Sequence, residues 1–160
     1  CLKKTAFVRS PSKRWFIPRS PLAATVAAIT YPSSGTAVDL AFTCRGTVTR
    51  CSRKTHLWLA AEQQFPRPRI WPKESEIVPD ETGNWEQNVH HQAPEAEFRL
   101  ALYAASHSAH RKILKWLDQS NGTGTWCELY RPAGMVRVQL VMLRSGESAP
   151  EAQDVAVVAS

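Results

Sequence analysis

The sequence lacks any apolar run long enough to cross a lipid bilayer. Its longest candidate, PLAATVAAIT, falls well short of the roughly 18–20 residues that a spanning helix requires. A phosphate-binding loop is also missing, because the glycine-containing stretch NGTGT is not followed by the lysine that such a loop needs. No internal repeat of the solenoid type is present. The sequence therefore indicates neither a transmembrane helix, nor a P-loop nucleotide site, nor a repeat protein.

The four cysteines form no CxxC pair and show no zinc-finger spacing. We interpret Cys1, Cys44, Cys51 and Cys127 as small apolar side chains that are mostly buried. A bridge between Cys44 and Cys51 would require an exported protein. Because the chain begins with Cys1 rather than Met, we expect it to be either a processed product or a fragment of a longer one, and the sequence leaves open whether a targeting segment preceded it.

Acidic residues are absent from the first 20 positions, and this asymmetry accounts for the net charge of +6. The rest of the chain carries 14 basic and 14 acidic residues and is neutral overall. Charged ends that contain proline and serine are usually solvated, so residues 1–21 are predicted to form a basic disordered tail. The basic residues of this tail are Lys3, Lys4, Arg9, Lys13, Arg14 and Arg19.

Beyond the tail, positive and negative charges occupy different segments. Basic residues come first, at Arg45, Arg50, Arg53 and Lys54. The segment 74–97 then carries seven acidic residues and neither lysine nor arginine. This segregation predicts a bipolar domain, whose field could orient a partner.

Alternating hydrophobicity predicts several β-strands. In the clearest case, from Val38 to Val48, the even-numbered side chains share one face, Leu40 among them, and Gly46 indicates a bulge. The stretch HLWLAAE is apolar on both faces, which is typical of a central strand covered on both sides. RIW, between prolines, reads as a short edge strand. NWEQNV, EFRLALYA and MVRVQLVMLR alternate again.

One helix is predicted late in the chain. Ser106 or Ser108 serves as its N-cap, and Asn121-Gly122 supplies its stop. Between these signals, apolar residues recur at helical spacing and should pack on the domain. They are Ala109, Ile113, Trp116 and Leu117.

About seven short strands separated by turn signals, with a single late helix, predict a mainly β fold of the sandwich type over residues 22–144. Residues 145–160 are small and acidic, and we expect them to form a disordered acidic tail. A 160-residue chain has room for one such domain with a substantial core. Four side chains are expected to meet between the two sheets: Trp58, Phe42, Leu100 and Val138.

Seven short motifs follow one another in a specific order over about residues 25–144. They are ITYPSSGTAV, FTCRGTV, LWLAA, RIWPK, GNWEQNV, EFRLALYA and RVQLVMLR. This order resembles that of small bacterial immunoglobulin-like modules. The resemblance implies an immunoglobulin-like antiparallel β-sandwich with one short helix before the last strand. It also implies an accessory domain of a larger bacterial envelope or cytoplasmic signalling protein. The aromatic-rich edge is similar, by analogy, to YEATS-type sandwiches, which read acylated lysines.

Few residues are arranged for catalysis or metal binding. His107 and His110 stand three positions apart at the helix start, and zinc binding would require a strand end to meet them. No carboxylate or cysteine has a spacing that completes such a site, so no metal and no cofactor are predicted. Glu95 and Glu97 share one strand face, but an acidic solvent face is commoner than an acid/base pair. We therefore predict that the protein is not an enzyme.

Three binding functions remain. The first is a non-enzymatic interaction module whose protein partner contacts an exposed edge formed by Arg69, Trp71 and Lys73. The second is binding of nucleic acid or another anionic surface by the basic tail, with Trp15 and Phe16 stacking on bases. The basic segment of the body would contribute to it through Arg45, Arg50, Arg53 and Lys54. The third is reading of a peptide or an acyl-lysine by an aromatic pocket.

Overall fold

The structure is a computed structural model that describes residues 21–64, 66–92 and 96–146. Apart from residues 21, 145 and 146, the two predicted tails lie outside these ranges, as do all six basic residues of the first tail. In the described part, no helix is long and apolar enough to cross a membrane.

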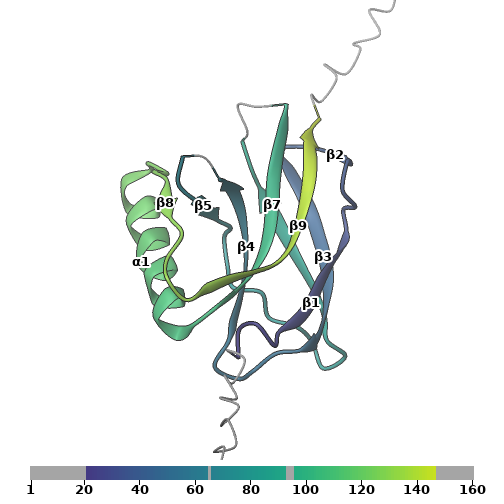
Figure 1. Ribbon diagram of the computed structural model, residues 1–160. Helices are drawn as coiled ribbons and strands as arrows, with labels where there is room; N and C mark the ends of the chain where they lie inside the picture. The colour runs from purple at the N-terminus through teal and green to yellow at the C-terminus, as the bar shows by residue number, and fades with distance from the viewer. Residues whose placement is uncertain (1–20, 65, 93–95, 147–160) are drawn as a thin grey trace, which may run out of the picture.

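Two β-sheets and one helix form three layers (Figure 1). The smaller sheet has the order β1 (Val26–Tyr31), β3 (Ala41–Arg50), β6 (Asn84–His90). The larger sheet has the order β2 (Ala37–Val38), β9 (Met135–Ser145), β7 (Glu97–Ala105), β4 (His56–Gln63), β5 (Arg69–Pro72), β8 (Leu129–Tyr130). Helix α1 (His107–Thr123) covers the outer face of the larger sheet. The predicted mainly β sandwich with a helix before the last strands is confirmed.

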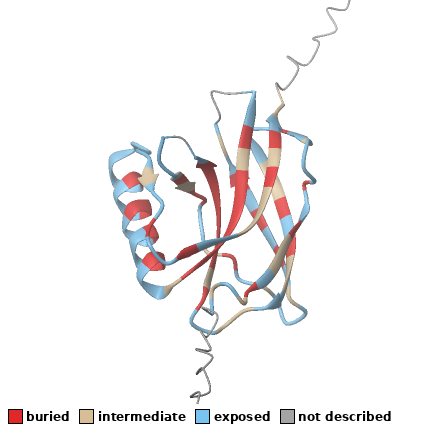
Figure 2. Cartoon of the chain, in the orientation of Figure 1, coloured by how far each residue is buried: buried red, intermediate tan, exposed pale blue. Residues whose placement is uncertain are grey.

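Strand β4 lies in the middle of the larger sheet, between β7 and β5, and is buried along almost its whole length (Figure 2). Its side chains alternate between two apolar environments. Leu57 and Leu59 pack between the sheets, whereas Trp58 and Ala60 pack beneath α1. Both faces of β4 are apolar because each is covered by another layer, as predicted for a central strand.

Trp58 is fully buried, but the prediction that it lies between the sheets is wrong. It contacts the cluster beneath α1, which includes Ile113 and Trp116. Leu100 does lie in the core between the sheets, and Phe42 and Val138 pack half-buried at its margin. An all-apolar strand does not reveal which of its faces meets the second sheet, and this ambiguity explains the error.

Two of the predicted alternations are interrupted. Val38 belongs to β2 in the larger sheet, and the chain then crosses to β3 in the smaller one, which leaves Leu40 exposed. In β9, Val138 is an extra residue between the pairs that Arg137 and Gln139 form with β7. This bulge reverses the inward-facing parity along the last strand.

The helix begins at the predicted cap and ends later than predicted. Ser106 Oγ accepts a hydrogen bond from the Ala109 N–H at 3.2 Å, and the predicted apolar stripe is buried. Asn121 and Gly122 continue the helix. It ends at Gly124, whose φ of 69° is the left-handed conformation that glycine adopts readily.

The basic and acidic segments do not lie at opposite poles. Strand β3 pairs with β6 in antiparallel register, so Arg45 faces Glu86 directly. Their side chains form an exposed ion pair at 2.7 Å. The prediction of a bipolar domain is therefore wrong for this pair, because the pairing of β3 with β6 places the basic and acidic segments side by side.

Candidate functional site

A large groove opens at the end of the sandwich where β4 ends and β7 begins. Its volume is about 1480 Å³, and its wall comes from β4, β5, β6, β7, β9 and α1. The lining residues that matter most for recognition are Trp71, Lys73, His91, Trp116 and Trp126. Aromatic and basic side chains of this kind are typical of binding clefts.

The three predicted edge residues have different environments. Trp71 is half-buried and lines the groove. Arg69 is half-buried beside the ring of Tyr130 and forms an ion pair with Glu128 at 3.3 Å. Lys73 is only 6% exposed, so the prediction that it is an exposed contact is wrong. In addition, β5 is not the edge strand, because β8 pairs with it on the far side.

The Lys73 ammonium group is held at the groove by two acceptors from the end of β6. Its Nζ lies 2.9 Å from His91 Nδ1 and 3.3 Å from the His90 carbonyl oxygen. An ammonium has three donors, so one N–H is left for another partner. Burial lowers the pKa of Lys73 to about 8, an effect that the nearby Glu74 carboxylate partly offsets. At pH 7 the group is still mostly protonated, so it acts as a cationic donor.

His91 is the neutral partner of this lysine. Burial, with a smaller effect of the Lys73 charge, lowers the pKa of His91 to about 4. Its Nδ1 therefore accepts the hydrogen bond from Lys73 and carries no proton. The neighbouring Glu74 carboxylate is engaged in a short ion pair with His90 Nδ1.

Three tryptophans supply the apolar part of the groove. Trp116 and Trp126 meet edge to face, with ring centroids 5.6 Å apart, and Trp116 Nε1 donates to the Cys127 carbonyl at 3.0 Å. Trp126 remains 50% exposed. Trp71 lies on the same groove wall. Sequence analysis missed Trp126 as a site residue, although a tryptophan just after a helix stop is an unusual loop residue.

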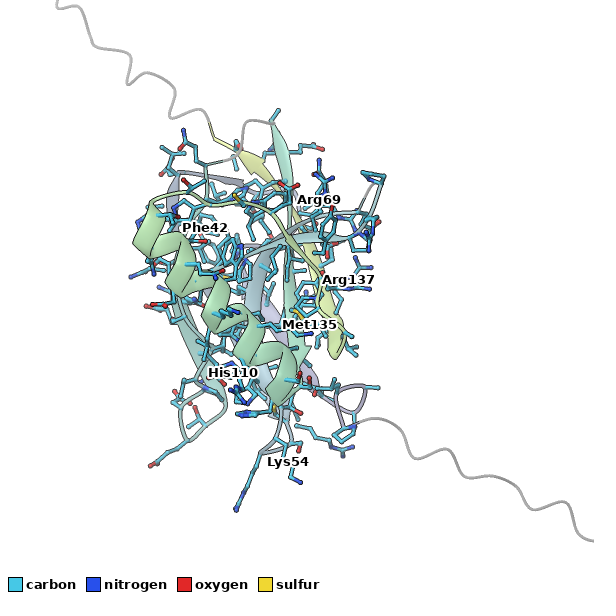
Figure 3. All side chains as sticks on the ribbon, turned by 90° about the vertical axis from the view of Figure 1, so that its left-hand side faces the viewer. Phe42, Lys54, Arg69, His110, Met135 and Arg137 are labelled. Carbon is cyan, nitrogen blue, oxygen red and sulfur yellow. The ribbon has the colours of Figure 1, made fainter. Side chains whose placement is uncertain are left out.

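A buried carboxylate links neighbouring strands by hydrogen bonds on the β4 side of the groove. Glu62 accepts hydrogen bonds from Tyr103, from Arg99 at 3.0 Å and from Arg137 at 2.7 Å. Burial raises the pKa of this carboxyl, but the three donors outweigh burial and hold its pKa below the ordinary value. Because Glu62 and its arginines are satisfied by one another, they give the wall a fixed shape. In Figure 3, Arg69 is labelled in the upper part of the view, Arg137 below it and His110 near the lower end of α1.

The basic residues of the anion-binding alternative are not assembled into a site. Among the described ones, Arg45 is ion-paired, while Arg50, Arg53 and Lys54 are exposed around the β3–β4 connection. The tail lysines and arginines lie outside the described residues. The three described cysteines are free thiols, of which Cys44 is buried as predicted, Cys51 is half-buried and Cys127 is exposed, so the prediction of burial is wrong for Cys127. Burial raises the pKa of Cys44 to about 12.

A second polar cluster lies at the opposite end of β4. His56, Glu76 and His110 place ligating atoms within 4.8 Å of one another, and His107 adjoins them. The strand start and the helix start therefore do meet, with a carboxylate that sequence spacing did not reveal, because Glu76 lies 20 residues from His56.

Comparisons with family models and with curated proteins found no match to this chain.

Proposed function

We propose that the protein is a non-enzymatic interaction module whose groove holds an acidic, partly apolar peptide segment of a partner protein. The single observation that carries this proposal is Lys73. Its buried ammonium lines the groove, yet among the described residues it takes part in no ion pair. Burying this cation is costly, the nearby Glu74 carboxylate offsets that cost only in part, and a ligand carboxylate in contact with the ammonium would compensate the rest.

Two acidic groups of the groove wall already have partners. Glu62 is satisfied by Arg99 and Arg137, and Glu74 is paired with His90. Lys73, in contrast, is a buried cation that keeps one N–H for a ligand. An acidic side chain fits this requirement better than an acylated lysine, because an acylated lysine is neutral.

The tryptophans favour a peptide that also carries apolar side chains. Trp126 is half-exposed and is held edge to face by Trp116, so its ring is presented to the groove without large loss of side-chain freedom on binding. Tryptophan is among the residue types that most often dominate interface energies. The resemblance to immunoglobulin-like modules adds that such a domain would act as an accessory unit of a larger protein.

The proposal predicts a specific set of selected peptides. A display library of random 12-residue peptides, selected on the full chain, should yield sequences that combine Asp or Glu with an aromatic or large aliphatic residue. Lys73→Met should weaken the best peptide by about 30-fold or more in fluorescence anisotropy, since removing one partner of a buried charge pair costs roughly 2–5 kcal/mol. Changing the selected acidic residue to its amide should have a similar effect.

The matched control is Lys112→Met, because Lys112 is an exposed lysine of α1. This variant should bind like the unchanged protein. Selected peptides that lack acidic residues, or an equal loss of peptide affinity in both lysine variants, would disprove that Lys73 binds an acidic peptide. Binding of a single-stranded oligonucleotide that competes with the peptide and depends on Lys73 would assign the groove to phosphate instead.

A further inference from the structure

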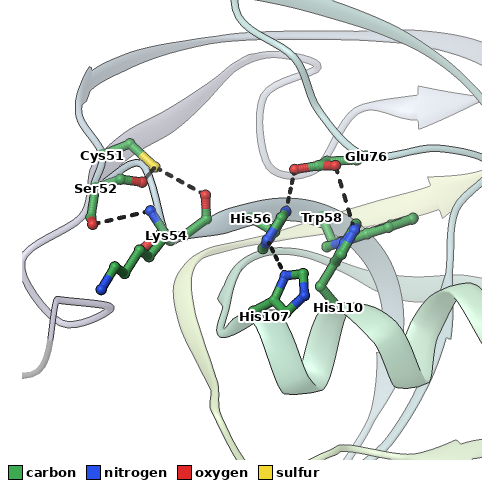
Figure 4. Close-up of polar contacts among 9 residues, drawn as sticks. Cys51, Ser52, Lys54, His56, Trp58, Glu76, His107 and His110 are labelled. Carbon is green, nitrogen blue, oxygen red and sulfur yellow. Dashed lines mark hydrogen bonds and ion pairs between the residues drawn. The ribbon is translucent and has the colours of Figure 1, made fainter.

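Four ionisable side chains converge at the end of β4 that is far from the groove (Figure 4). His56 is the first residue of β4, and His107 and His110 lie in the first turn of α1. Glu76 comes from the segment between β5 and β6, which pairs with β4 at Ile77. Three separate parts of the chain thus bring imidazole and carboxylate ligands to one place.

Hydrogen bonds fix which ring nitrogens carry protons. His56 Nδ1 lies 2.7 Å from Glu76 Oε1, so Nδ1 donates to the carboxylate and Nε2 of the neutral ring keeps its lone pair. His107 Nδ1 lies 3.3 Å from this Nε2. A carboxylate that accepts the far N–H of a histidine orients that ring in the way found around metal-binding histidines.

His110 has a different role. Trp58 Nε1 donates to His110 Nδ1 at 3.1 Å, so the proton of the neutral ring lies on Nε2, which faces Glu76 at 3.8 Å. The rings of His56 and His110 are stacked, with centroids 3.7 Å apart and planes inclined by only 7°. A metal ion lies near the plane of each imidazole that binds it, and parallel stacked planes share no such point. His56 and His110 therefore do not bind one ion together in this arrangement.

The His56–His107 pair has the spacing that a tetrahedral ion requires. Zinc–nitrogen bonds of about 2.0–2.1 Å place neighbouring ligand atoms about 3.3–3.4 Å apart. The observed separation of His56 Nε2 and His107 Nδ1 is 3.3 Å, and the two ring planes are inclined by 40° rather than stacked in parallel. His107 is exposed, so its ring can turn toward an ion.

We propose that His56 Nε2 and His107 Nδ1 bind a divalent ion of the zinc type, with Glu76 orienting His56 and His110 supporting its ring by stacking. The remaining coordination positions are open to water or to a ligand from another molecule. This site is independent of the groove, and it departs from the prediction that the chain has no metal site.

Isothermal titration of the tag-free full chain with Zn²⁺ at pH 7.5 tests the site. One ion should bind per chain, and His107→Ala should weaken it at least about tenfold. Glu76→Gln should weaken it by about 10–100-fold, the effect typical of losing the carboxylate that orients a ligating histidine.

His90→Ala is the matched control, because His90 is also an exposed histidine paired with a glutamate, outside the cluster. Its zinc affinity should equal that of the unchanged chain. His110→Phe keeps an aromatic ring against His56 and should retain zinc binding. The proposal is overturned if the unchanged chain binds no zinc, or if His107→Ala binds normally while His110→Phe does not. Melting curves of each variant show that a lost affinity is not a lost fold.

Discussion

Trp58→Ala is expected to lower the free energy of unfolding by about 3–5 kcal/mol, the usual cost of truncating a large aromatic side chain in a core. Trp58 has no exposed surface and packs beneath α1 with Ile113 and Trp116. The substitution also removes the N–H that His110 accepts at 3.1 Å. Because domains of this size are stable by only about 5–15 kcal/mol, urea denaturation should show a much lower midpoint.

Trp126→Ala is the comparison for this variant. Trp126 is half-exposed, so its removal should change stability far less while weakening peptide binding at the groove. Trp58→Phe should lie between the two, because it keeps a six-membered aromatic ring in the core and loses only the pyrrole part of the indole with its N–H. If Trp58→Ala unfolded at the same urea concentration as the unchanged protein, the layer between α1 and the larger sheet would not exist as described.

Gly46→Ala is expected to destabilise the fold strongly although it adds only one methyl group. A Cβ at this position would lie 2.0 Å from the Ala28 carbonyl oxygen and 2.2 Å from a carbon of the Trp85 ring. Strand β3 would have to move away from β1 or expel the Trp85 indole from the core. Overpacking of this kind typically lowers the free energy of unfolding by about 1–3 kcal/mol. Because the clash at Gly46 involves backbone, we expect a loss of about 3 kcal/mol or more.

Gly122→Ala provides the opposite control. Gly122 lies in the last turn of α1, and a Cβ there would meet no atom within 4 Å. Alanine should therefore stabilise the helix by up to about 1 kcal/mol. Equal stabilities of the two variants in urea denaturation would contradict the close approach of Trp85 to Gly46.

Local patterns predicted most of the elements. Period-two alternation located β6 and β7, and the cap at Ser106 with the stripe through Ile113 located α1. What local patterns could not predict was the layer that each face meets. The face of Trp58 depends on the helix returning to the outer side of the sheet, about 50 residues further along the chain. Gly46 suggested a bulge. The β3–β6 register runs through Gly46 without a shift, but the β1–β3 register shifts beside it, between Ile29 and Tyr31, and the glycine also makes room for Trp85.

The site was less predictable than the fold. Trp71 was found because an aromatic residue between prolines is conspicuous, and it does line the groove. Lys73 is buried at the end of β6, where it contacts His90 and His91. These histidines lie 17 and 18 residues away in the sequence, so no local pattern around Lys73 predicts the contact. The same holds for Glu76, which meets His56 only because the segment after β5 turns back along β4. Sites assembled from distant segments need the tertiary structure.

The pKa of the Lys73 amine, followed by NMR of the labelled side chain with and without a selected acidic peptide, tests the groove most directly. In the free protein the pKa should be near 8, because burial disfavours the ammonium. A bound carboxylate favours the charged form, so the peptide should raise this pKa, and its affinity should fall as the pH rises above about 8. The amide-substituted peptide should leave the pKa unchanged. A free-protein pKa near the ordinary 10.5, or a value that the acidic peptide does not move, would contradict a buried cation that receives an anionic ligand.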